Sequence, residues 1–199
     1  TSIVTNGGNI TIGGGSGSTV GSLSIIGAFT FDNGITIRGL LNAGGGDINI
    51  AASTPVAGAY GVFVSGPGAL QTSGTGSINV TGTVTGGAAG TGVAMVGSGG
   101  IANSGSGAVN VTGIAAGGLG MDIGTIASTA ISGAAITLAA DSLALNSGQV
   151  SAPGGTVTVH PVTATTSIFL GEATGSGLVL SNTALQRIET ATLNIGSTS

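Results

Sequence analysis

The chain has no cysteine, no lysine and no tryptophan, and charged residues make up only 4% of its 199 positions. The absence of cysteine excludes disulfides and thiolate metal sites. Charge normally takes about a quarter of a globular sequence, so few titratable groups are present to activate one another. An enzyme that depends on a cluster of acids and bases is therefore disfavoured.

The few charges also exclude two kinds of partner. Six acidic residues stand against two arginines, Arg38 and Arg187, and the net charge is -4. With no basic patch, the sequence predicts no nucleic-acid partner and no polybasic contact with a membrane. No apolar run reaches the roughly 18 residues of a membrane-spanning helix, so no membrane insertion is expected.

Glycine and small or β-branched aliphatic residues fill the space that charge leaves. Glycine supplies 42 positions, and hydrophobic residues reach 41%, which is too many for a disordered chain. Ile and Val favour strands, where a branched side chain packs on a pleated surface. The composition therefore indicates an all-β protein with many turns.

Internal repeats are the clearest signal in the sequence. Residues 61–82 align with residues 92–113 at an offset of 31, and residues 40–50 align with 70–80 at an offset of 30. Residues 120–138 follow the same pattern more loosely. These alignments place Leu40, Leu70 and Ile101 at one repeat position, and they place Ile48, Ile78 and Val109 at another. A quasi-periodic chain of this kind is typical of a solenoid.

A shorter unit recurs within the repeats, formed by an aliphatic residue, then Asn, Thr or Ser, then another aliphatic residue. Near the N-terminus it returns at less than half the spacing of the long repeat, beginning at Ile10, Leu23, Ile35 and Ile48. In a strand the outer two side chains point one way and the middle one the other. The pattern predicts a right-handed parallel β-helix of roughly nine or ten coils, at about 20 residues a coil. The alternative, an antiparallel meander, would show two-residue turn signals between strands of matched length.

Only residues 183–190 have some helical character, and a short turn or 3₁₀ segment is expected there. No other helix is predicted. Because the chain starts and ends in strand-like sequence, we expect one β-helix unit over residues 1–199 that belongs to a longer polypeptide.

Three segments near the C-terminus carry a family resemblance: residues 168–171 (IFLG), 178–188 (LVLSNTALQRI) and 190–196 (TATLNIG). This region resembles the recurring unit of filamentous-haemagglutinin-like exoproteins, the two-partner-secretion adhesins of Gram-negative bacteria. The resemblance divides the chain into a family-like unit at 151–199 and irregular Gly-rich coils at 1–150, which match the family only in style.

The resemblance implies a β-helical shaft of a secreted protein at the cell surface. It further implies export through an outer-membrane transporter and a role in adhesion, biofilm or filament formation. The expected partners are that transporter, a host-cell or surface receptor, and further copies of the chain. The family shaft has no catalytic residue to transfer, and neither a catalytic residue nor a cofactor is predicted.

One row of polar residues is the candidate functional surface. Asn and Thr recur in the middle of the triplets and are predicted to face outward in one row: Thr36, Asn49, Asn79, Asn110, Thr137, Thr158 and Asn194. The simpler interpretation is a solubilising face on a nearly uncharged protein. The alternative function is a ligand-binding solenoid for polysaccharide or ice, which requires a flat, regular row over at least four coils.

The acidic residues offer weaker candidates. Asp47 follows three glycines, as in a calcium-binding nonapeptide repeat, but its equivalents are Ser77 and Ala108, so no metal site is predicted. A polysaccharide-cleaving enzyme would need a carboxylate pair, for which the candidates are Glu172 with Glu189 and Asp122 with Asp141. The chain has no lysine and no tryptophan to complete such a site.

The single histidine and the aromatic residues complete the survey. His160 is expected at the exposed end of a strand, without the partners that a general base or a metal ligand needs. Phe29, Phe31, Tyr60 and Phe63 are the candidates for a ligand groove. In a solenoid, aromatic side chains more often fill a corner of the core or stack between coils.

Overall fold

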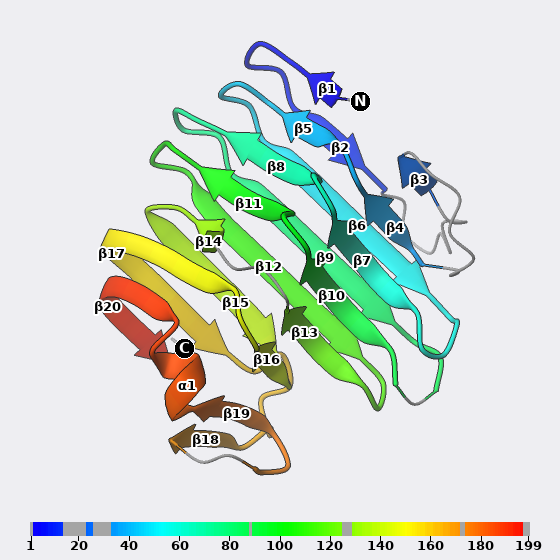
Figure 1. Ribbon diagram of the computed structural model, residues 1–199, viewed down its shortest axis with the longest axis vertical. Helices are drawn as coiled ribbons and strands as arrows, with labels where there is room; N and C mark the ends of the chain where they lie inside the picture. The colour runs from blue at the N-terminus through cyan, green and yellow to red at the C-terminus, as the bar shows by residue number, and fades with distance from the viewer. Residues whose placement is uncertain are drawn as a thin grey trace.

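The computed structural model describes residues 2–13, 23–25, 33–87, 89–124, 129–171 and 174–196. These residues form twenty β-strands and one short helix, α1 (Asn182–Leu185). All the strand pairs are parallel, and the chain winds through them as a right-handed parallel β-helix (Figure 1). The predicted fold class is confirmed.

The strands of successive turns stack on three faces of the β-helix. The first face stacks β1 (Ser2–Val4), β5 (Leu40–Asn42), β8 (Ala69–Thr72), β11 (Gly100–Asn103) and β14 (Thr129–Ser132). The second face stacks β2 (Ile10–Ile12), β6 (Ile48–Thr54), β9 (Ile78–Val84), β12 (Ala108–Ala115) and β15 (Ala135–Ala140). The third face stacks β3 (Leu23–Ile25), β4 (Ile35–Ile37), β7 (Tyr60–Ser65), β10 (Thr91–Val96), β13 (Leu119–Ile123) and β16 (Leu143–Leu145).

Two long strands finish the stack. β17 (Gln149–His160) pairs with β14 and then with β15, so it joins the first and second faces into one sheet. β20 (Ile188–Ile195) pairs with both halves of β17, with a register shift between Ala152 and Thr156. Between them the chain forms the pair β18 (Ile168–Gly171) and β19 (Leu178–Ser181), and then α1, which contacts β16 (Figure 1).

The strand register confirms the long repeat and corrects the number of coils. Asn49 pairs with Asn79 and Asn79 with Asn110, at offsets of 30 and 31. In these two steps one full turn is one long repeat, whereas other turns range from 21 residues, between Thr137 and Thr158, to 38 residues, between Thr11 and Asn49. The described strands of the second face form seven rungs rather than nine or ten. The short spacing between the N-terminal triplets is the distance between successive strands and not the length of a turn. The triplets of β3 and β4 lie on the third face, whereas those of β2 and β6 lie on the second.

The alignment of the repeats was right at one position and wrong by one residue at another. Ile48, Ile78 and Val109 are in register, as predicted. On the first face, Leu70 pairs with Ile101, but its partner in the previous turn is Leu41 and not Leu40. Leu41 is fully buried, so it is the residue that continues the core.

Stacked aliphatic side chains form the core. Ile78 and Val80 of β9 point inward from the second face, and Val93 and Met95 of β10 point inward from the third face, all at most 1% exposed. Equivalent residues lie above and below them in the neighbouring turns. Each such side chain contributes about 1.5–3 kcal/mol relative to leaving it in water, so the column stabilises the fold without ion pairs.

At one end of the cross-section the second and third faces approach too closely for side chains. A Cβ on Gly82 would lie 2.1 Å from the carbonyl oxygen of Gly92, and one on Gly113 would lie 1.9 Å from that of Gly120. Only glycine fits at these positions, because the backbones of the two faces are in contact. The cross-section of the β-helix is therefore narrowest at this edge.

The short helix and the turn that follows it agree with the weak helical signal. The Ser181 side chain caps α1 by accepting a hydrogen bond of 3.1 Å from the backbone N–H of Ala184. The helix lasts four residues, and β20 begins at Ile188. In the described ranges, no helix has the length and apolar character needed to cross a membrane.

Candidate functional site

The candidate polar row lies on the outer side of the second face. Thr11 pairs with Asn49, and the row continues in register from turn to turn through Asn79, Asn110, Thr137, Thr158 and Asn194. On the strands from β2 to β17 the row alternates with buried aliphatic residues, and its members from Asn49 to Asn194 are half-buried. Seven rungs of Asn or Thr therefore form one continuous line.

Thr36 does not belong to this row, and its assignment was wrong. It pairs with Phe63 on the third face and is 9% exposed. Its hydroxyl oxygen accepts a hydrogen bond of 3.1 Å from the amide of Asn33, which is also buried. Thr36 thus satisfies a buried partner instead of facing a ligand.

The three asparagines in the middle of the row form a hydrogen-bonded ladder. Nδ2 of Asn79 donates to Oδ1 of Asn49 over 2.9 Å, and Nδ2 of Asn110 donates to Oδ1 of Asn79 over 2.8 Å. Each amide is held by its neighbour and keeps only part of its hydrogen-bonding capacity for solvent. The ladder links the turns to one another and leaves the outer surface uncharged.

Asp47 acts as a link between turns. Its carboxylate Oδ1 accepts a hydrogen bond of 2.8 Å from the backbone N–H of Ser77, and its own N–H donates to Oδ1 of Asn9 over 2.8 Å. The Asp47 carboxylate therefore has a structural role, because it joins one corner of the β-helix to the next turn. Within the described ranges, no group of three or more histidine or acidic side chains is placed to hold a metal ion.

The acids considered as catalytic pairs have separate partners. Asp122, on β13, accepts a hydrogen bond of 3.2 Å from Asn146. Asp141 accepts hydrogen bonds from the backbone N–H and the hydroxyl of Thr163, over 2.7 and 2.6 Å. Glu189 accepts from Ser151 over 3.0 Å. Glu172 lies outside the described residues.

The pKa values of the two aspartates move in opposite directions. Burial raises the pKa of Asp122, and the hydrogen bond from Asn146 offsets only part of that effect. Burial also acts to raise the pKa of Asp141, but the hydrogen bonds from Thr163 and its neighbours outweigh it and lower the pKa overall. Each shift has a local structural cause.

His160 and the aromatic residues also have local roles. His160 ends β17, half-buried, and its Nδ1 lies 2.9 Å from the carbonyl oxygen of Pro161. Tyr60 and Phe63 stack on each other with ring centroids 4.5 Å apart. They extend from β7 on the third face, half-buried. Phe29 and Phe31 lie outside the described residues.

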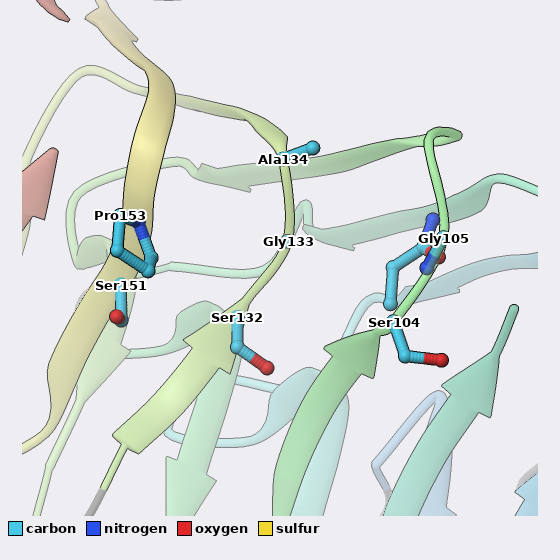
Figure 2. Close-up of a pocket in the computed structure, with 8 residues that line it drawn as sticks. Ser104, Gly105, Ser132, Gly133, Ala134, Ser151 and Pro153 are labelled. Carbon is cyan, nitrogen blue, oxygen red and sulfur yellow. The ribbon is translucent and has the colours of Figure 1, made fainter. Parts of the chain in front are cut away.

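The sequence did not reveal a groove at the corner between the first and second faces. One hollow of about 450 Å³ is lined by residues of three turns, including Ser104, Ser132, Ser151 and Pro153 (Figure 2). A second hollow, of about 360 Å³, is lined by Asn42, Gln71, Ser73 and Ser104 among others. Because Ser104 lines both, we call the two together the corner groove.

A difference in loop length creates the larger hollow. Ala102 pairs with Ser132, and Ala108 pairs with Ala135, so five residues (103–107) form the corner of one turn and two (133 and 134) that of the next. In the following turn four residues (152–155) lie between Ser151 and Thr156. The shortened corner between longer neighbours leaves the notch seen in Figure 2.

The fold and these surfaces define the class of the protein as a parallel β-helix with few charged groups on its outer faces. Comparison of the chain with known protein families, with curated protein sequences and with solved structures finds no match.

Proposed function

We propose that this chain is a segment of the structural, adhesive shaft of a secreted bacterial surface protein. The observation that carries the proposal is the seven-rung stack, in which the aliphatic columns and the Asn/Thr row continue in register from β2 to β20. Backbone hydrogen bonds and buried aliphatic side chains make such a stack stiff without charged groups.

The stack must continue beyond these turns to act as a shaft. Six intervals of about 4.8 Å between seven rungs give a height of about 29 Å, which is short for a rod. Among the described strands, β20 pairs only with β17, so its other edge presents unpaired backbone groups. Such an edge is a template for a further strand.

The two ends of the stack have matching patterns. The first rung of the second face reads Ile10-Thr11-Ile12, and the last reads Leu193-Asn194-Ile195. Leu193 is 36% exposed at one end, and Ile3 and Val4 on β1 are 40% and 57% exposed at the other. A further turn, from the same polypeptide or from another copy, would cover these side chains and extend each column.

The resemblance of residues 151–199 to filamentous-haemagglutinin-like exoproteins supports the surface location, the outer-membrane transporter and the role in adhesion or biofilm. The chemistry of the described residues supports a non-enzymatic role, because Asp122, Asp141 and Glu189 each hold a different local partner. Adhesion itself is tested by saturable binding of the purified chain to host cells, glycans and abiotic surfaces.

The shaft is tested by joining two copies of the chain in tandem. If the turns continue from copy to copy, thirteen intervals of about 4.8 Å give a single body about 62 Å high in small-angle scattering. Its unfolding midpoint should also rise above that of one copy, because one more interface between turns is formed. Two independent bodies with the midpoint of a single copy would contradict the shaft.

A second candidate function is a ligand-binding solenoid for polysaccharide or ice. The Asn/Thr row favours it, because the row extends over seven rungs where four were required. Inhibition of ice recrystallisation by the chain, abolished by Thr137→Lys within the row, would support ice binding. An equal loss of inhibition in a lysine variant on the third face, Ala144→Lys, would argue against a specific surface.

A further inference from the structure

The corner groove runs along the axis of the β-helix. Asn42, Gln71, Ala102, Ser132 and Ser151 follow one another in register on successive turns, and each lines one of the two hollows. Four intervals of about 4.8 Å give the groove a length of about 19 Å. A linear polymer of several sugar units would fit along it, with successive units facing successive turns.

The lining of the corner groove is polar and uncharged. Both hollows are lined only by Asn, Gln, Ser, Thr, Gly, Ala and Pro residues. Within the described part of the chain, the side chains of Gln71, Ser73 and Ser132 make no hydrogen bond. These groups can exchange hydrogen bonds with ligand hydroxyls, while Ala102, Ala134 and Pro153 offer small apolar surfaces to the faces of a sugar ring.

The walls of the groove are fixed before any ligand arrives. Asn103, which is 5% exposed, donates from Nδ2 to the carbonyl oxygens of Gly76 and Gly107, both over 2.8 Å. Its Oδ1 accepts from the N–H of Gly105 over 2.9 Å. These bonds tie the corner loop to the previous turn. A preformed wall loses little conformational entropy when a ligand binds.

We propose that the corner groove binds a linear, uncharged polysaccharide that lies parallel to the helix axis. An acidic polymer would find no cationic side chain in the lining, and Glu189, which accepts a hydrogen bond from Ser151, would repel it at one end. A peptide strand would add to a sheet edge, whereas the groove crosses the outer surface of several strands. This proposal assigns a ligand to the β-helix, and it does not depend on the proposal that the chain is part of a shaft.

The test uses the full chain and three variants. Ser104→Trp fills the point where the two hollows meet, and Gln71→Ala removes a hydrogen-bonding group without filling the groove. The matched control is Ser98→Trp, at an exposed turn of the same coil. Ser98 donates to the carbonyl oxygen of Gly66 over 2.8 Å, much as Ser104 donates to that of Thr72 over 3.4 Å. Circular dichroism establishes that each variant is folded.

The probes are cellohexaose, laminarihexaose and mannohexaose, with oligogalacturonate as the acidic comparison, and binding is measured by calorimetry and ligand-observed NMR. We expect a Kd of about 1 mM for at least one neutral probe. Ser104→Trp should weaken it by at least about tenfold, and Gln71→Ala by about two- to tenfold, as expected for one lost hydrogen bond. Ser98→Trp should leave it unchanged.

Three results would overturn the proposal: no binding of any neutral probe, binding of oligogalacturonate alone, or equal weakening by Ser98→Trp and Ser104→Trp. The height of the tandem protein is measured separately for the Ser104→Trp variant. Because that height depends on stacking and not on the groove, failure of the groove proposal and failure of the shaft proposal are distinguishable.

Discussion

Nδ2 of Asn110 donates a hydrogen bond of 2.8 Å to Oδ1 of Asn79, which lies one long repeat earlier in the chain and directly below it in the stack. Asn79 in turn donates to Asn49 over 2.9 Å. The side chains of three successive turns are thus connected outside the core. A slip by one residue would break this ladder and would also place aliphatic side chains outward, so the register of these turns is strongly specified.

Replacing Asn79 with alanine removes both bonds of the ladder. We expect Asn79→Ala to lower the free energy of unfolding by about 1–3 kcal/mol, because each bond contributes about 0.5–1.5 kcal/mol. Chemical denaturation monitored by circular dichroism measures the change. Asn194→Ala, at the last rung of the same row, is the control and should have a smaller effect. Equal effects at the two positions would contradict a stabilising ladder.

The narrow edge of the β-helix predicts a steric effect. Gly82→Ala places a Cβ 2.1 Å from the carbonyl oxygen of Gly92, so the two faces must separate. We expect a loss of stability of about 3 kcal/mol. In Gly8→Ala the nearest atom to the new Cβ is 3.6 Å away, in the side chain of Thr5, and stability should change by less than about 1 kcal/mol. Similar thermal midpoints for both variants would exclude the close approach.

Asp141 gives stability a dependence on acid pH. Its pKa is lowered in the folded protein, so its contribution is present above the ordinary value of 3.8 and is lost as the pH falls through the folded value. Asp141→Asn should reduce stability at neutral pH, and it should make the decrease of stability at acid pH (the acid limb) less steep. Urea titrations at a series of pH values measure both effects. An acid limb of unchanged slope in the variant would show that Asp141 is not responsible.

Asp122 should act in the opposite sense. Burial raises its pKa, so its contribution is fully present below 3.8 and is lost as the pH rises through the folded value. Asp122→Asn removes the buried charge, and we expect the variant to gain stability relative to the original chain as the pH rises above that window. The same titrations apply, and a variant that is less stable than the original at neutral pH would contradict this account.

The sequence predicted the fold because, in the middle of the chain, its long repeat is also the structural turn. The offset of 31 that aligns residue 79 with residue 110 is the offset at which the two asparagines pair. Gly66 and Gly97 occupy equivalent corner positions in successive turns, with φ of 62° and 74°, a conformation that explains why glycine recurs there. These features are local, and a sequence pattern expresses them directly.

The errors concern arrangement in three dimensions. Ile35-Thr36-Ile37 has the same pattern as Ile10-Thr11-Ile12, but it lies on the third face, and alternation within a strand does not specify the face. The corner groove depends on the difference between three loop lengths. That difference becomes visible in the sequence only when the anchors Ser132 and Ala135 are assigned to their rungs.

All the proposals for this chain depend on turns that stack in register. Since the chain has no native cysteine, spin labels can be attached at Thr11→Cys and Asn194→Cys, at the two ends of the outer row. Seven rungs predict a narrow distance distribution near 29 Å from six intervals of about 4.8 Å, measured by pulsed electron paramagnetic resonance. A mean distance of about 38–43 Å, as nine or ten shorter coils would give, or a broad distribution, would contradict the seven-turn stack.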